Sequence, residues 1–128
     1  MTIKIYFLQI KFYFCEYYFT CVQIRPKTYI MVIITKTTIQ EYGKTHTNAI
    51  DALNDWFIRT KLADWSNFNE LRQDFPSCDF VGNDRFVFNI KGNRYRLVTI
   101  IHFDIRTVYV RFIGTHAEYD KIKNIQNI

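Results

Sequence analysis

Basic side chains concentrate in one segment toward the C-terminal end of this 128-residue chain, accompanied by amides and a histidine. Residues 85–116 contain six Lys or Arg residues and a single acid, Asp104, which gives a net charge of +5. Residues 31–84 carry five basic and eight acidic groups, a net charge of −3. Arginines interspersed with Asn89, Asn93 and His116 suit contacts to nucleic-acid phosphates. The alternative is the solvated face of an ordinary sheet, which is the commoner fate of strand arginines.

Other kinds of site find little support in the sequence. Cys15, Cys21 and Cys78 are an odd number without C-x-x-C spacing, so we expect neither a disulfide framework nor a zinc site. The three histidines are widely spaced, and no Gly-rich phosphate loop or nucleophile motif is present. We therefore expect no metal, no cofactor and a cytoplasmic protein, with Cys78 as a small buried residue.

The basic segment has the pattern of three strands. Residues 86–90, 94–102 and 107–113 are β-branched and aromatic runs, and Gly92 between the first two can take the positive φ of a tight turn. Alternation along a strand then places Arg94 and Arg96 on one face, and Tyr109 and Arg111 on one face of the next strand. If these two strands pair, Arg96 and Arg111 point into one basic concavity.

A strand and helices precede this sheet. Residues 31–34 form a short apolar strand, and helices are predicted over 38–44 and about 48–61. The second helix has Ile50, Leu53 and Phe57 at helical spacing with Trp56 beside them, and Thr47 or Asn48 as its cap.

A third helix and a last one complete the pattern. Asn67 and Glu70 resemble a capping box at the start of the third helix, which runs through Leu71 and is ended by Pro76. With a short helix near residues 116–123, the order of elements predicts an α+β fold.

Residues 1–30 differ in composition from the rest. They contain no Gly, Ala, Ser or Asp, and aromatic residues crowd the stretch between Tyr6 and Phe19. Lys4, Lys11 and Glu16 interrupt the roughly 20 apolar residues that a membrane span needs, and no small-residue cleavage site follows. We interpret this segment as upstream translated sequence, with Met31 as the working start. The alternative is a genuine β-rich or weakly membrane-associating extension.

The chain from residue 31 to about residue 122 resembles the HigB toxins of bacterial type II toxin–antitoxin modules, in the RelE-like superfamily. The resemblance rests on separated segments that occur in the same order at tight spacing. These segments are Phe75-Pro-Ser77, Val87-Phe-Asn89, Lys91-Gly-Asn93, Tyr95-Arg-Leu97, Tyr109-Val-Arg111 and Gly114-Thr-His-Ala-Glu-Tyr-Asp120. Residues 1–30 lie outside the resemblance, so we divide the chain into an extension, 1–30, and a toxin domain, 31–128.

The resemblance implies a fold, an activity and partners. The fold is a curved antiparallel sheet packed on N-terminal helices with a short C-terminal helix. The activity is that of a metal-independent endoribonuclease that cuts mRNA, in the ribosomal A site, by attack of a ribose 2′-hydroxyl on the adjacent phosphate. The implied partner is a HigA-like helix-turn-helix antitoxin, and no membrane is expected.

Such a reaction needs an acid, a base and cations for the phosphate. His116 is the best acid–base candidate, because the ordinary pKa of an imidazole, about 6.5, is close to working pH. Tyr119 would share its helix face and could donate a proton or stack on a base. Arg96 and Arg111 would hold the phosphate.

Weaker expectations complete the candidate site. Four further residues are candidates for RNA binding: Asn89, Lys91, Asn93 and Arg94. His102, on the same strand face as Arg96, is a secondary acid–base candidate. Each main residue also has a structural alternative: His116 caps the last helix, Tyr119 packs in the core, and Arg111 pairs with Asp120 or Glu118. At the level of the whole chain, the alternatives are a non-catalytic RNA- or ribosome-binding module and an inactive toxin that only binds its antitoxin.

Overall fold

The computed structural model describes residues 31–34 and 36–128, so the interpretation of residues 1–30 lies outside the described part of the chain. The first elements are β1 (Val32–Ile34), α2 (Lys36–Thr45), the short 3₁₀ turn η1 (Thr47–Ala49), α3 (Ile50–Leu62) and α4 (Phe68–Asp74). Then come β2 (Asp79–Gly82), β3 (Arg85–Ile90), β4 (Tyr95–His102), β5 (Thr107–Thr115), α5 (His116–Asp120) and η2 (Ile125–Asn127). The predicted α+β class is confirmed.

The five strands form one sheet in the order β1-β5-β4-β3-β2. Strands β2 to β5 are a meander of antiparallel pairs, whereas β1 lies parallel to β5 at the edge. The predicted antiparallel meander is therefore confirmed, and the predicted N-terminal strand joins it as a parallel edge strand, which makes the sheet mixed. A parallel pair needs a long connection, and here the helices between β1 and β2 supply it.

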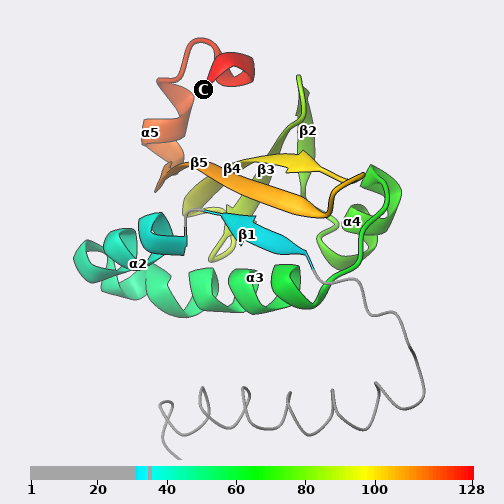
Figure 1. Cartoon of the computed structure of the whole chain (residues 1–128). Helices are drawn as coiled ribbons and strands as arrows, with labels where there is room; N and C mark the ends of the chain where they lie inside the picture. Colours follow the sequence, from blue (N-terminus) through cyan, green and yellow to red (C-terminus); the bar gives the residue numbers. More distant parts are fainter. Residues whose placement is uncertain (1–30, 35) are drawn as a thin grey trace, which may run out of the picture.

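The helices between β1 and β2 cover one face of the sheet. Figure 1 shows α2 and α3 beneath the sheet and α5 with the C-terminus on its opposite side. Leu53 and Trp56 of α3 are buried, and the Trp56 ring meets the Phe88 ring edge-on at 5.4 Å. This burial of apolar side chains from two layers is the main stabilising contribution to the fold.

The buried stripe of α3 differs from the expected one. Leu53, Trp56 and Thr60 are its buried residues, whereas Ile50 is 38% exposed and Phe57 only half-buried. The cap was also predicted wrongly, because Thr47 and Asn48 belong to η1 and the N-cap residue, Ala49, has no side-chain bond to offer. The extra 3₁₀ turn shifts the start of the helix to Ile50.

The cap of α4 was predicted correctly. Asn67 Oδ1 accepts a hydrogen bond from the backbone N–H of Glu70 at 3.0 Å. The Glu70 carboxylate accepts from the backbone N–H and the hydroxyl of Ser66, which lowers the pKa of Glu70 through these bonds. The helix continues to Asp74, a little beyond the predicted end and just before Pro76.

Strand β2 was not predicted. It has four residues, its pairing with β3 is irregular between Phe80 and Gly82, and Gly82 has a φ of +95°. Only glycine adopts such a φ without strain. A short, exposed edge strand with a glycine has too little alternation to be recognised from sequence.

In the described part of the chain, no helix has the length and apolar character needed to cross a membrane.

Candidate active site on the open face of the sheet

The face of the sheet opposite α2, α3 and α4, here called the open face, carries the polar residues of β3 and β4. Phe88 and Leu97 point into the core, so alternation places Asn89 and Arg96 on the open face. The strand register aligns Asn89 with Arg96, and Arg96 with Gly114. Asn89 and Arg96 are thus neighbours across two strands, as a shared binding face requires.

Arg96 has an unusual environment. Its guanidinium carbon lies 5.7 Å from the centre of the Tyr119 ring, a cation–π contact between β4 and α5. Its Nε atom is buried and has no hydrogen-bond partner among the described residues. A buried donor without an acceptor costs about 1–3 kcal/mol, so this arrangement suits an acceptor brought by a ligand.

His116 is the first residue of α5, but it is not the cap. Thr115 is the N-cap residue and forms a full capping box with Glu118. His116 Nδ1 donates a hydrogen bond to Asp120 Oδ2 at 2.9 Å, one helical turn away. This bond orients the imidazole and leaves Nε2 available. The His116 and Asp120 side chains are 41% and 59% exposed, so a polymer can reach them.

The start of α5 is tied to the turn before β4. The backbone N–H of His116 donates to the Arg94 carbonyl at 3.0 Å, which places His116 at the end of the sheet where Arg96 lies. Arg94 and Asn93 are exposed in the turn that spans residues 91–94. Arg94 therefore precedes β4 and does not share a strand face with Arg96 as predicted.

Tyr119 lies half-buried between α5 and the sheet. Burial raises the pKa of its phenol, the nearby Arg96 cation opposes that shift, and the Asp79 and Asp120 carboxylates add to it. The phenol therefore keeps its proton at neutral pH. The protonated phenol lies beside the Arg96 cation, and Asp79 is a neighbour that the sequence did not suggest.

Arg111 reaches the open face through a bulge in β5. The register pairs Val110 with Thr99 and Phe112 with Val98, which leaves Arg111 without a cross-strand partner. Since Val110 and Ile113 both point into the core, Arg111 and Phe112 both face outward. Arg111 is exposed and lies just beyond Phe112, whose row is the next outward-facing one after the row of Arg96 and Gly114. Within the described residues, no ion pair joins Arg111 to Asp120 or Glu118.

Two predicted residues lie away from Arg96. The Lys91 side chain turns toward the helical layer, where Nζ donates to the Asn48 carbonyl at 2.8 Å. His102 is at the other end of β4, next to Tyr109.

From the sequence, Asp120 was suggested only as a partner for Arg111. Its spacing of four residues from His116 in a helix was the available signal for the observed pair.

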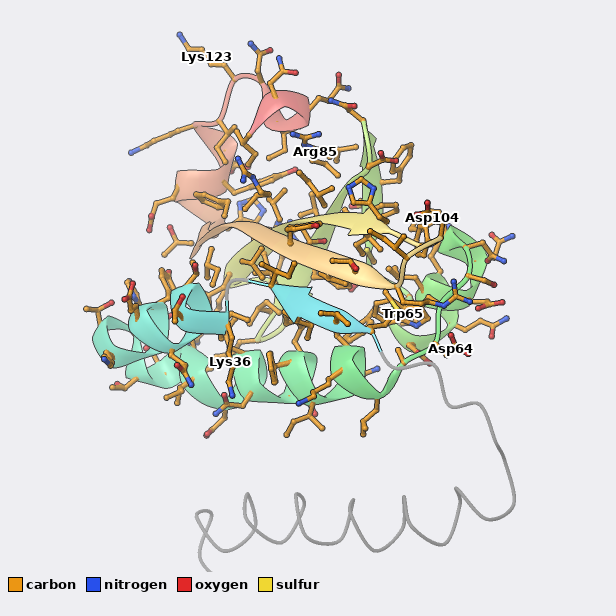
Figure 2. The ribbon with its side chains drawn as sticks, in the orientation of Figure 1. Lys36, Asp64, Trp65, Arg85, Asp104 and Lys123 are labelled. Atoms are coloured by element: carbon orange, nitrogen blue, oxygen red, sulfur yellow. The ribbon has the colours of Figure 1, made fainter. Side chains whose placement is uncertain are left out.

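The C-terminal segment crosses the open face and is held there by β3 and by the turn that precedes it. Arg85 Nη2 donates to the backbone oxygen of Ile128 at 2.7 Å, and Asn83 Nδ2 donates to the Gln126 carbonyl at 3.1 Å. Figure 2 shows Arg85 next to the C-terminal segment, above the sheet.

Among the described residues, no group of three or more His, Cys, Asp or Glu side chains is placed to hold a metal ion.

Comparison of the sequence with known proteins identifies the family of this chain. Residues 49–122, more than half of the chain, match the HigB toxin family, described as a RelE-like toxic component of a toxin–antitoxin system. The chain belongs to the HigB toxin family. The matched residues include every candidate at this site, from Asn89 to Asp120, and the resemblance inferred from the sequence is confirmed.

Named relatives agree with this assignment. The mRNA interferase HigB of Escherichia coli O6:H1 is 33% identical over 94 residues, which span 72% of this chain and 91% of the relative. The mRNA interferase toxin HigB of Escherichia coli K12 and the mRNA interferase HigB of Shigella flexneri are each 42% identical over 52 residues, half of their length. The chain is thus the toxin of a toxin–antitoxin module, has an antitoxin as partner, and is assigned to the endoribonucleases.

Proposed function

We propose that this HigB toxin cleaves mRNA without a metal ion, by attack of a ribose 2′-hydroxyl on the adjacent phosphate, in the ribosomal A site. The observation that carries the proposal is the grouping of three side chains at one end of the open face. His116 is oriented by Asp120, and Arg96 has an unpartnered buried donor and lies against Tyr119.

The reaction requires two proton transfers and a stabilised phosphorane. A bond forms between the 2′-oxygen and phosphorus, the bond from phosphorus to the 5′-oxygen breaks, and the products are a 2′,3′-cyclic phosphate and a 5′-hydroxyl. His116 Nε2 accepts the proton of the 2′-hydroxyl, since Nδ1 is bonded to Asp120. Tyr119 donates a proton to the 5′-oxygen, since the Arg96 cation beside it opposes the rise in pKa that burial causes and so favours proton release.

The arginines neutralise charge on the phosphate. Arg96 donates through Nε and a terminal nitrogen to the non-bridging oxygens, a bidentate geometry that matches phosphate. Arg111 is exposed on the next strand and adds a second cation. Its attraction to the phosphate strengthens as negative charge develops in the transition state. Asn89, Asn93 and Arg94 extend the RNA contacts beside Arg96. Lys91 contributes charge only at the edge of this surface.

The antitoxin is proposed to be a HigA-like helix-turn-helix protein that covers the open face. Residues 85–116 carry a net charge of +5, so an acidic or helix-presenting segment of the antitoxin complements this face. Such a segment blocks both the phosphate site and entry into the ribosome. Since the substrate is mRNA on ribosomes, we place the toxin in the cytoplasm.

Mapping of RNA ends tests this function. Brief induction of the toxin is expected to produce new 5′-hydroxyl ends within translated regions, and co-expression of the helix-turn-helix protein encoded beside it should abolish them. With purified toxin, cleavage should persist in excess EDTA and require translating ribosomes. Ends that carry a 5′-phosphate, or cleavage stopped by EDTA, would contradict the proposed chemistry. If the new 5′-hydroxyl ends still form when the neighbouring protein is co-expressed, that protein is not the antitoxin.

The toxin domain is proposed to begin at Met31. The Met31 side chain is 1% exposed in the core, and its backbone N–H donates to the Ala63 carbonyl at 3.2 Å. A protein that starts at Met31 is therefore expected to melt within a few degrees of the full chain and to arrest growth equally well. Circular dichroism melts and growth curves of the two proteins, expressed side by side, measure this. Loss of folding or toxicity in the shorter protein alone would show that residues 1–30 are required.

A further inference from the structure

A second group of side chains lies on the open face, at the opposite end of the strands from His116. The register aligns Ile34, Tyr109 and Ile100 across β1, β5 and β4, and Val32, Thr107 and His102 in the next row. The side chains of these rows that face outward form what we call the distal patch: Val32, Ile34, Ile100, His102 and Tyr109.

The β1 side of the distal patch is exposed, and the patch carries two half-buried rings. Val32 is 54% exposed and Ile34 is 41% exposed, although both lie in a strand. The His102 and Tyr109 rings are in contact with centres 5.8 Å apart and planes at 77°. An edge-to-face contact covers one face of only one ring, so this contact itself leaves the other ring faces free. Neither ring has a hydrogen-bond partner among the described residues.

The distal patch lies further along the strands than the candidate site, and the exposed connection between them is on β5, because Val98 between Arg96 and Ile100 on β4 is buried. Arg96 and Ile100 are four residues apart on β4, about 13 Å at the usual rise of a strand. Exposed Arg111 lies on β5 between the rows of Gly114 and Tyr109. A cation is therefore placed between Arg96 and the distal patch. A nucleic-acid strand advances by about 3.4 Å per stacked nucleotide and further when extended, so it covers this distance in a few nucleotides.

We propose that the distal patch is a subsite for an unpaired base of the RNA, a few nucleotides from the cleaved bond, with Tyr109 as the stacking ring. This proposal rests on the proposed function. Aromatic rings beside a basic side chain are the usual surface for single-stranded RNA, because the rings stack on bases and the cation contacts the backbone. An ordinary protein interface would share the apolar edge of β1, but it would not explain the alignment with Arg111 and Arg96.

Binding of short RNAs measures the subsite independently of cleavage. The probes are a fluorescein-labelled dinucleotide and a hexanucleotide, each with 2′-O-methyl groups so that neither can be cut, followed by fluorescence anisotropy with the full-length toxin. The hexanucleotide should bind the parent more tightly than the dinucleotide. Tyr109→Ala should lose roughly tenfold in hexanucleotide affinity, as expected for one stacked base, and Tyr109→Phe should stay within about twofold of the parent, because it keeps the ring.

Ile105→Ala is the matched control, because Ile105 is 59% exposed in the turn beside the distal patch. This variant should bind both RNAs as the parent does, and all variants should show the parent's circular dichroism spectrum. Tyr109→Ala binding at parent affinity, or no hexanucleotide binding by the parent, would overturn the subsite. Loss of antitoxin binding with unchanged RNA binding would also overturn it and assign the patch to a protein. Tyr109-dependent binding by a parent that does not cleave RNA would contradict the proposed function and leave the subsite standing.

Discussion

His116→Ala should reduce the rate of RNA cleavage by about 10²–10⁴-fold, the usual contribution of a general acid or base. The fold should not change, since His116 is partly exposed and the α5 cap is supplied by Thr115 and Glu118. The measurement is single-turnover cleavage of mRNA on purified ribosomes, with a growth-arrest assay and a circular dichroism melt of the same variant.

Asp120 gives this prediction a second variant. Asp120→Asn removes the charge that orients the imidazole and leaves His116 itself in place, so we expect kcat to fall by less than in His116→Ala with KM little changed. A purely structural role for the pair would instead lower the melting temperature and leave activity per folded molecule unchanged. A His116→Ala variant that melts like the parent and arrests growth at full strength would remove His116 from the mechanism, and Tyr119 or His102 would become the leading candidate.

Sequence patterning was sufficient for most of the sheet. Strands β3, β4 and β5 were placed to within one or two residues, because their alternation and the turn at Gly92 are strong local signals. The same alternation predicted that Tyr109 and Arg111 share a face of β5. It could not predict the bulge at Arg111, which depends on the register against β4.

The details of the site were only partly accessible from the sequence. The residue types at positions 96, 116 and 119 suggested phosphate chemistry, but the pairing of His116 with Asp120 needs a helix that begins exactly one residue after Thr115. The diversion of Lys91 to the Asn48 carbonyl depends on how the helical layer meets the turn after β3. The contact between Lys91 and Asn48 joins distant parts of the chain, and local patterns carry no information on it.

Arg96→Ala should lower cleavage by roughly 10²–10³-fold, the cost of removing one preorganised donor to a developing negative charge. The melting temperature should stay near that of the parent or rise, since the buried Nε has no partner to lose. Arg96→Lys should recover only part of the rate, because an ammonium keeps the charge but lacks the planar fork that holds two phosphate oxygens.

Arg72→Ala is the matched control for this prediction. Arg72 lies over the Phe68 ring at 5.7 Å, the same cation–π distance as Arg96 over Tyr119, but it belongs to α4 in the helical layer. Its removal should cost only the small free energy of this cation–π contact and leave cleavage unchanged. If both variants cleave RNA at the parent rate, the cation–π contact of Arg96 is merely structural. If Arg96→Ala alone loses activity without a fall in melting temperature, Arg96 acts on the phosphate, because Arg72→Ala then shows that loss of a cation–π contact alone leaves cleavage intact.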